Sequence, residues 1–140
     1  MSAIKIYRIA NKLYKLRIPI LPKILYRLIY ILNNCHVHYS TEIGEGTNIG
    51  YGGIGVVIHK NATIGKNCMI SSCVTIGGRS NIKQLPVIGD NVYIGTGARV
   101  LGDVKIGDNV IIGANAVVIE SVPNNCTVAG VPAKIIKNNN

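Results

Sequence analysis

Aliphatic residues recur every six positions along most of the chain. The longest regular series comprises Ile88, Ile94, Val100, Ile106, Ile112 and Val118. An earlier series of Ile58, Ile64, Ile70 and Ile76 continues into it through Ile82, and is itself preceded by Val37, Ile43 and Ile49. Between Ile49 and Ile58 the step is nine, which indicates three inserted residues around Tyr51–Gly55. A period of six matches neither the roughly 3.6-residue period of a helix nor the turn spacing of about 8–12 residues in a β-sandwich.

A second regularity lies four positions after each aliphatic residue, where the side chain is small or β-branched. These positions hold Thr41, Thr47, Ala62, Cys68, Val74, Val92, Ala98, Val104, Val110 and Ala116. Glycine often follows the aliphatic residue directly, and Asn and Asp occupy turns where left-handed backbone is tolerated. Each hexapeptide therefore predicts one short strand and a turn, with three hexapeptides closing a triangular coil and coils stacking about 4.8 Å apart. We predict an all-β parallel solenoid over residues 35–136, followed by a polar tail at 137–140.

Residues 1–34 have a different pattern and predict a short helical segment. Between residues 3 and 17, apolar side chains at helical spacing alternate with Lys5, Arg8, Lys12 and Lys15, as in a basic amphipathic helix. Pro19 and Pro22 interrupt this helix, and a second apolar stretch follows at 24–32. The segment would either cover the open strand edge at the end of the solenoid or lie at a membrane surface, near lipid-linked glycan.

The charge distribution limits the possible partners. The formal net charge is +9, and residues 1–33 contribute seven basic side chains and no acidic one. The remainder is nearly neutral, with eight basic and six acidic residues, so nucleic-acid binding by the solenoid has little electrostatic support. We expect no transmembrane span, because no long uninterrupted apolar run exists. Reduced cysteines in no metal-ligand spacing favour a cytoplasmic location, with peripheral contact to the inner membrane face through residues 1–33 as a further option.

Residues 37–136 resemble the serine-acetyltransferase-like branch of the hexapeptide-repeat acyltransferases. The similar stretches are Gly-Val-Val-Ile-His at 55–59, Val-Thr-Ile-Gly-Gly at 74–78, Ile-Gly-Ala-Asn-Ala-Val-Val at 112–118 and, most specifically, Ala-Gly-Val-Pro-Ala-Lys-Ile-Ile at 129–136. This resemblance implies a left-handed coil, a homotrimer and acetyl-CoA bound in grooves between neighbouring subunits. It implies no metal ion, although three histidines shared across a trimer would also suit zinc.

Transfer of an acetyl group to a hydroxyl requires a base for the hydroxyl proton and donors for the oxyanion. Histidine is the usual base near neutral pH, and the chain has only His36, His38 and His59. His38 and His59 each follow an inward aliphatic residue, so we expect them to stack at one edge of adjacent coils. Steps of six would continue that edge with three glycines, Gly77, Gly95 and Gly113. This column favours a base beside a cofactor cleft, whereas solvated turn histidines are the alternative, and His36 is expected to be structural.

The chain departs from serine acetyltransferases at two places. Their catalytic Asp–His pair would fall within Gly50–Gly53, where Tyr51 or Gly52 stands in place of histidine, and the loop Arg79–Pro86 also lacks a histidine. The sequence of residues 51–59 resembles instead homologues encoded with surface-polysaccharide genes. That resemblance implies His59 as the general base beside His38, a sugar hydroxyl as the acceptor, and Tyr51 and Arg79 as acceptor-binding residues. A serine O-acetyltransferase and a non-catalytic trimeric β-helix binding protein are the alternatives.

The same resemblance gives a set of cofactor-binding positions, Gly77, Gly78, Thr96, Gly97, Ala114 and Lys134. Glycines would let the pantetheine arm of acetyl-CoA lie against the backbone, and Lys134 would meet a phosphate of CoA. Glycine at a tight corner also has a purely structural explanation. Cys68 is at an inward position and predicts core packing, while Cys73 has no base nearby and is not expected to act as a nucleophile.

Overall fold

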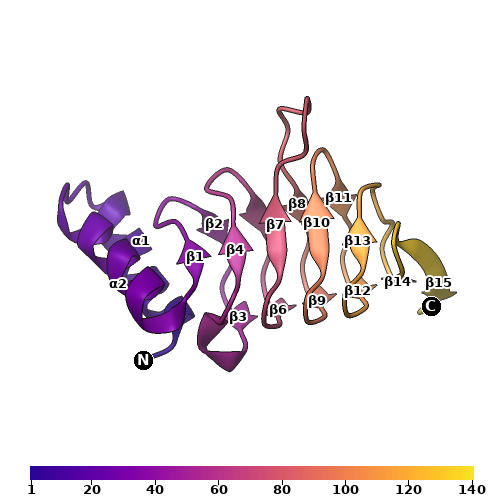
Figure 1. Cartoon of the computed structure of the whole chain (residues 1–140), viewed down its shortest axis with the longest axis horizontal. Coiled ribbons are helices and arrows are strands. Elements are labelled where there is room, and N and C mark those ends of the chain that lie inside the picture. The colour runs from indigo at the N-terminus through magenta and orange to yellow at the C-terminus, as the bar shows by residue number, and fades with distance from the viewer.

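The computed structural model describes all residues 1–140 as two N-terminal helices, α1 (Ala3–Lys15) and α2 (Leu21–Asn33), followed by a parallel β-helix (Figure 1). The β1 sheet comprises β1 (His36–Val37), β4 (Val57–Ile58), β7 (Thr75–Gly77), β10 (Arg99–Leu101) and β13 (Val117–Val118). The β2 sheet comprises β2 (Glu42–Ile43), β5 (Thr63–Ile64), β8 (Val87–Ile88) and β11 (Lys105–Ile106). The β3 sheet comprises β3 (Asn48–Ile49), β6 (Met69–Ile70), β9 (Tyr93–Ile94), β12 (Ile111–Ile112), β14 (Cys126–Ala129) and the antiparallel β15 (Lys134–Asn138).

Successive strands of the chain belong to successive sheets, so each coil of the solenoid has three faces and three corners. This arrangement confirms the predicted fold class, an all-β, left-handed parallel β-helix with a short N-terminal helical segment. The inward aliphatic residues stack in register, as where Ile58 pairs with Val37 on one side and Ile76 on the other. The small positions four residues further on are all buried as well, Cys68 among them.

Two insertions interrupt the repeat, and only the first was located from the sequence. The 3-10 turn η1 (Tyr51–Gly53) accounts for the nine-residue step between Ile49 and Ile58. The second insertion lengthens the step from Ile76 to Ile88 and forms the loop 78–86, which rises above the other turns between β7 and β8 (Figure 1). The prediction that Ile82 continues the inward series is therefore wrong, because Ile88 takes the next place by pairing with Ile64.

The missed insertion also changes the column of residues that follows the two histidines. Because the loop lengthens one step from six residues to twelve, it preserves the six-residue phase while moving every later residue to a different corner. Leu101, which pairs with Gly77, is the next residue at the histidine corner. Gly95 and Gly113 follow β9 and β12 of the β3 sheet instead, so their predicted place above the histidines is wrong.

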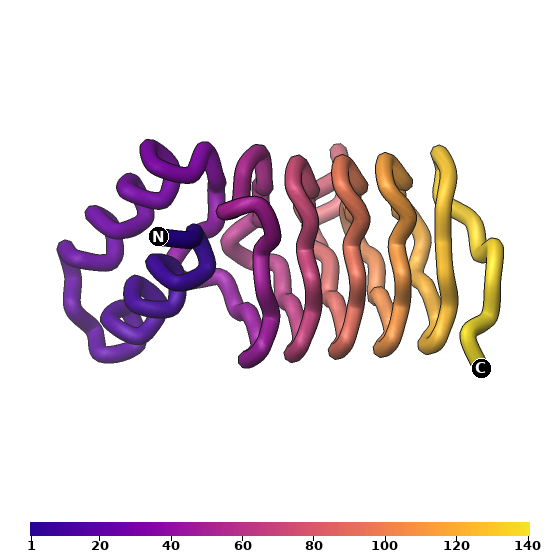
Figure 2. The backbone as a smooth tube through the Cα atoms, turned by 90° about the horizontal axis from the view of Figure 1, so that it is seen from below, coloured from indigo at the N-terminus to yellow at the C-terminus, as the bar shows by residue number.

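The two helices cover the N-terminal end of the β-helix (Figure 2). Tyr7 is buried against the first coil and donates a hydrogen bond to the carbonyl of Thr41. Arg8 donates to the carbonyls of Ile43 and Gly44, and Asn11 donates to the carbonyl of Tyr39. Helix α1 therefore caps the open first coil, which is one of the two roles predicted for the N-terminal segment. Neither helix has the length and hydrophobicity that crossing a membrane demands.

The C-terminal end of the solenoid is also covered. Strand β15 pairs antiparallel with β14 at the outer edge of the β3 sheet. It extends through Asn138 and so includes the first two residues of the predicted polar tail. At this end β15 covers the edge of the β3 sheet, while β13 and β11 are the last strands of the other two sheets.

Candidate active site

A cleft of about 370 Å³ lies at the corner where the β1 sheet turns into the β2 sheet. Its lining comprises His36, His38, Val57, Ile58, His59, Lys60, Ile76, Gly77 and Gly78. The register that stacks the inward residues of β1, β4 and β7 also stacks the residues that follow them. His38, His59 and Gly77 therefore occupy the same corner in three consecutive coils, as the repeat predicted for these three residues.

His38 is held firmly at this corner. Its Nδ1 atom lies 2.7 Å from the hydroxyl oxygen of Ser40 and 3.2 Å from the Ser40 backbone nitrogen. Its ring packs on the ring of Tyr39 with the centroids 4.0 Å apart and an interplanar angle of 34°. The centroid of the Tyr26 ring lies 5.1 Å from that of His38, with an interplanar angle of 64°. Burial lowers the pKa of His38, and the charge of Lys60 lowers it further. The imidazole is therefore neutral near pH 7, the form that can accept a proton.

His59 has a different hydrogen-bond environment. Its side chain is exposed, and its Nδ1 atom accepts the backbone N–H of Asn61 at 3.2 Å. In the neutral ring that bond leaves the proton on Nε2, which then donates toward the cleft. The backbone N–H of Ser40 likewise donates to Nδ1 of His38, so both neutral rings favour the tautomer with the proton on Nε2. His38 differs in the added contact with the Ser40 hydroxyl and in its packing among the tyrosine rings.

His36 and a group of tyrosines are the part of the site that the sequence did not reveal. The Tyr26 hydroxyl is hydrogen-bonded to Nε2 of His36, which also lines the cleft. The rings form one continuous cluster of Tyr14, Tyr39, His38, Tyr26 and His36. Two of these tyrosines come from the helices, so only the packing of α1 and α2 against the first coil brings them to the histidines. The available signal was the outward position of His36 beside the inward Val37.

The glycines of the cleft are not required by the fold. A Cβ atom added to Gly78 would meet no atom within 4 Å, and one added to Gly77 would lie 3.8 Å from its nearest neighbour, the Thr75 side chain. Gly97 contrasts with both, because its φ is +74° and an added Cβ would lie 2.1 Å from Oδ1 of Asn115. Stacking of the coils therefore explains Gly97 and leaves Gly77 and Gly78 facing open space in the cleft.

The remaining predicted site residues do not join this cleft within one chain. Thr96, Gly97 and Ala114 lie where the β3 sheet turns into the β1 sheet, at the opposite edge of the β1 sheet, and so does Tyr51 in η1. Lys134 begins β15 and lies 3.9 Å from Glu120 in an exposed ion pair. Arg79 is exposed and directly follows the cleft residue Gly78 in the loop.

Comparison with known proteins agrees with this architecture. Residues 86–120 match the family model for the bacterial transferase hexapeptide (six repeats). The serine acetyltransferase of Synechococcus elongatus is 40% identical over 137 residues, which span 96% of this chain and 56% of the relative. That of Staphylococcus epidermidis is 41% identical over 139 residues, or 98% of this chain and 65% of the relative. The chain thus spans a little more than half to about two thirds of the length of these relatives.

Solved structures show the same similarity in three dimensions. The serine acetyltransferase of Brucella abortus in complex with coenzyme A superimposes with a TM-score of 0.91 at 34% identity, over 99% of this chain and 56% of that one. Soybean serine acetyltransferase complexed with serine gives a TM-score of 0.87 at 34% identity, over 96% of this chain and 56% of that one.

Proposed function

We propose that the chain, which is similar to serine acetyltransferases and carries the hexapeptide repeat of the bacterial transferases, transfers an acetyl group from acetyl-CoA to a hydroxyl group. The observation that carries this proposal is the stacking of His38 and His59 next to Gly77 and Gly78 in one cleft. A neutral imidazole beside backbone that lies open to a ligand provides both a base and a surface for a thioester.

The different packing of the two histidines suggests a role for each. The packed, neutral imidazole of His38 takes the proton of the acceptor hydroxyl while the oxygen attacks the carbonyl carbon of the thioester. The Nε2–H of His59 donates to the oxyanion of the tetrahedral intermediate. Collapse of the intermediate breaks the carbon–sulfur bond, and the departing CoA thiolate takes up the proton from His38. This assignment moves the base from His59, where the sequence placed it, to His38, because His38 is packed among tyrosine rings and burial lowers its pKa, whereas His59 is exposed.

We further propose a homotrimer with its active sites between subunits. One chain presents His38, His59, Gly77 and Gly78 at one edge of the β1 sheet, and Thr96, Gly97 and Ala114 at the other edge. The two groups can meet only when two copies lie side by side. An apolar column on the outer face of the β3 sheet, Met69, Tyr93 and Ile111, is 39–46% exposed in the isolated chain and would be covered by such a contact.

Mixing two inactive variants tests the shared site. His38→Ala removes the base from one edge, and Thr96→Trp blocks the other edge at an exposed position. If sites form between chains, a randomly assembled 1:1 mixture recovers activity at roughly one quarter of all its sites, since each active site draws its intact edges from different chains. No recovery on mixing, with trimers verified by sedimentation, would show that each site lies within one chain.

Two acceptors are consistent with the cleft. The names of the relatives favour serine, which makes the chain a serine O-acetyltransferase in this proposal. A sugar hydroxyl is favoured by the lack of histidine at 50–53 and 79–86 and by the tyrosine rings beside His38, since amphipathic rings pack well against a pyranose face.

Turnover of acetyl-CoA with each acceptor decides between them. The purified chain should release free CoA thiol in the presence of serine or of one member of a panel of mono- and disaccharides, and mass spectrometry should find the product heavier by one acetyl group. Thiol release with an amine acceptor alone would replace O-transfer with N-transfer. Binding of the chain to immobilised CoA without turnover of any acceptor would favour the non-catalytic alternative.

A further inference from the structure

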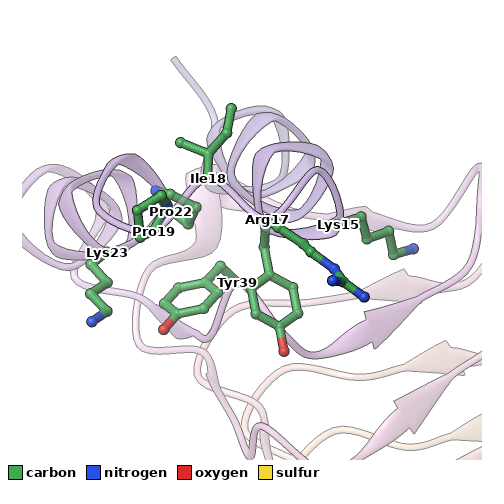
Figure 3. Close-up of a pocket in the computed structure, with 8 residues that line it drawn as sticks. Lys15, Arg17, Ile18, Pro19, Pro22, Lys23 and Tyr39 are labelled. Atoms are coloured by element: carbon green, nitrogen blue, oxygen red, sulfur yellow. The ribbon is translucent and has the colours of Figure 1, made fainter.

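A second and larger pocket, of about 550 Å³, lies where the turn between α1 and α2 faces the first corner of the β-helix (Figure 3). Its lining residues are Tyr14, Lys15, Arg17, Ile18, Pro19, Pro22, Lys23 and Tyr39. In Figure 3, Lys23 lies on one side of Tyr39, with Lys15 and Arg17 on the other. We call these eight residues the basic pocket. It contains three cationic side chains and no acidic one.

The charge of the basic pocket is not neutralised by the protein. No carboxylate precedes Glu42 in the sequence, and the single ion pair of the chain joins Lys134 to Glu120 at the other end of the molecule. Glu42 lies beside Lys15 in a neighbouring depression but forms no ion pair with it. Three unpaired cations around one concavity attract a multivalent anion, and guanidinium and ammonium groups are the usual partners of phosphate.

Tyr39 connects the basic pocket to the histidine cleft. On one side its ring lies 5.2 Å from the ring of Tyr14 within the pocket, and on the other it stacks on His38 at 4.0 Å. A single aromatic ring therefore separates the cations from the side chain assigned as the base. A molecule with an anionic group in the pocket would have its neighbouring part next to His38.

We propose that the basic pocket binds a phosphate or pyrophosphate group of the acetyl acceptor. This inference rests on the proposed function in one respect, that the cleft at His38 receives the acceptor hydroxyl. The chemistry recognised is a phosphate ester, whose source is either a soluble phosphorylated compound or the headgroup of a lipid. A phosphate-bearing acceptor also gives the positive N-terminal segment a role beyond capping the first coil.

Binding of inorganic pyrophosphate to the full chain, measured by calorimetry, tests the pocket without requiring turnover. The variant Lys15→Ala/Lys23→Ala removes two pocket charges and leaves Arg17 in place. Lys5→Ala/Lys12→Ala is the matched control, since it removes two exposed lysines of α1 that do not line the pocket. We expect pyrophosphate affinity to fall at least about tenfold in the pocket variant and less than about twofold in the control.

Three outcomes would overturn the proposal. The first is wild-type protein that fails to bind pyrophosphate, and the second is an equal loss in both variants, which would indicate diffuse charge rather than a site. The third is a comparable loss of coenzyme A affinity in the pocket variant, which would assign the pocket to the donor. If the wild type binds pyrophosphate but transfers no acetyl group to any acceptor, the proposed function is refuted while the phosphate site is retained.

The source of the phosphate is separated by two further probes. Uridine diphosphate represents a soluble pyrophosphate ester, and phosphatidylcholine vesicles containing phosphatidylglycerol represent a headgroup. If vesicles sediment the wild type and the Lys5→Ala/Lys12→Ala control but not the pocket variant, the headgroup is the source. If uridine diphosphate binds with the same pattern while vesicles do not, a soluble ester is the source. Vesicle binding that weakens equally in both variants counts against the pocket.

Discussion

The two long edges of the β1 sheet differ in what occupies their corners. The edge toward the β2 sheet holds His38, His59 and the open glycines, beside a cleft. The edge toward the β3 sheet holds Gly97 and Asn115, both with positive φ, in close contact from one coil to the next. A side chain has room where a corner faces open space, whereas at Gly97 an added Cβ would collide with Asn115 of the next coil.

This difference separates two reasons for glycine that look identical in the repeat. Gly95 is explained by packing, since an added Cβ would lie 2.6 Å from the backbone nitrogen of Ala114. Gly77 and Gly78 have no such neighbour, which agrees with the proposal that a ligand lies against them. In the proposed function the histidine edge therefore serves the acceptor and base within one chain, and the opposite edge would contribute through a neighbouring copy.

Substitution of His38 or His59 should have the largest effect on activity. We expect His38→Ala to lower kcat/KM by about 10²–10⁴-fold, because a positioned base contributes that much. His59→Ala should lower it by about 10²-fold, the cost of one oxyanion donor. The substitution by glutamine distinguishes the roles, since an amide N–H can donate but cannot take the hydroxyl proton. His59→Gln should keep most of the activity that His38→Gln loses, in initial-rate measurements with acetyl-CoA.

The reverse result has a clear meaning. If His38→Gln is tolerated and His59→Gln is as inactive as His59→Ala, His59 is the base that the sequence first suggested. Tyr39→Phe is a suitable control, because it preserves the ring stacked on His38 and should leave the rate within about twofold of wild type when the acceptor is uncharged.

Alanine substitutions at the two edges should affect stability differently. Gly95→Ala forces a methyl group against the backbone of the next coil and should lower the free energy of unfolding by about 1–3 kcal/mol. Gly77→Ala places its methyl group in open space and should change that free energy by less than about 0.5 kcal/mol. Urea denaturation followed by circular dichroism measures both. Equal destabilisation by the two variants would remove the distinction between the edges.

A larger side chain at Gly78 should affect cofactor binding without affecting stability. Gly78→Val fills part of the cleft and should raise the KM for acetyl-CoA about tenfold, while the unfolding free energy stays near the wild-type value. Thr127→Val, at an outward position of β14 far along the chain, is the matched control. An unchanged KM would show that acetyl-CoA does not approach Gly78.

The repeat predicted the solenoid because it depends only on local spacing. Each inward aliphatic residue and each small corner residue follows from the same six-residue unit, and the buried set matches both series except at Ile82. The first insertion was found because its three residues break the phase. The loop at 78–86 escaped notice because it adds a whole repeat, so the phase survived while Gly95 and Gly113 moved to another corner.

The site was predictable only as far as it lies within the repeat. His38, His59 and Gly77 came together because their stacking is a property of the coil. The tyrosines did not, because the contact of Tyr26 with His36 depends on how α2 folds back on the first coil, which no local spacing determines. The division of the predicted cofactor-binding residues between two edges was likewise not predictable, because it depends on the loop that determines which corner each residue occupies.

A change in the pH profile is the smallest expected effect and the most specific probe of His38. Burial lowers the pKa of His38 first, and the positive charge of Lys60 and the neighbouring His36 lower it further. A base must be neutral, so kcat/KM should fall as pH drops through this lowered pKa, below the ordinary histidine value of about 6.5. Lys60→Ala removes one lowering charge, which raises the pKa and moves the acid limb of the profile to higher pH by a few tenths of a unit.

The matched control is Lys105→Ala, which removes an exposed lysine from β11 on the β2 sheet. Both variants should have the same activity as the wild type on the plateau above pH 8, because His38 is neutral there in every case. At pH 6, Lys60→Ala alone should lose activity, and this loss should diminish as salt is added and the charge is screened. A shift of the acid limb in the opposite direction, or the same shift in Lys105→Ala, would mean that the limb reports a group other than His38.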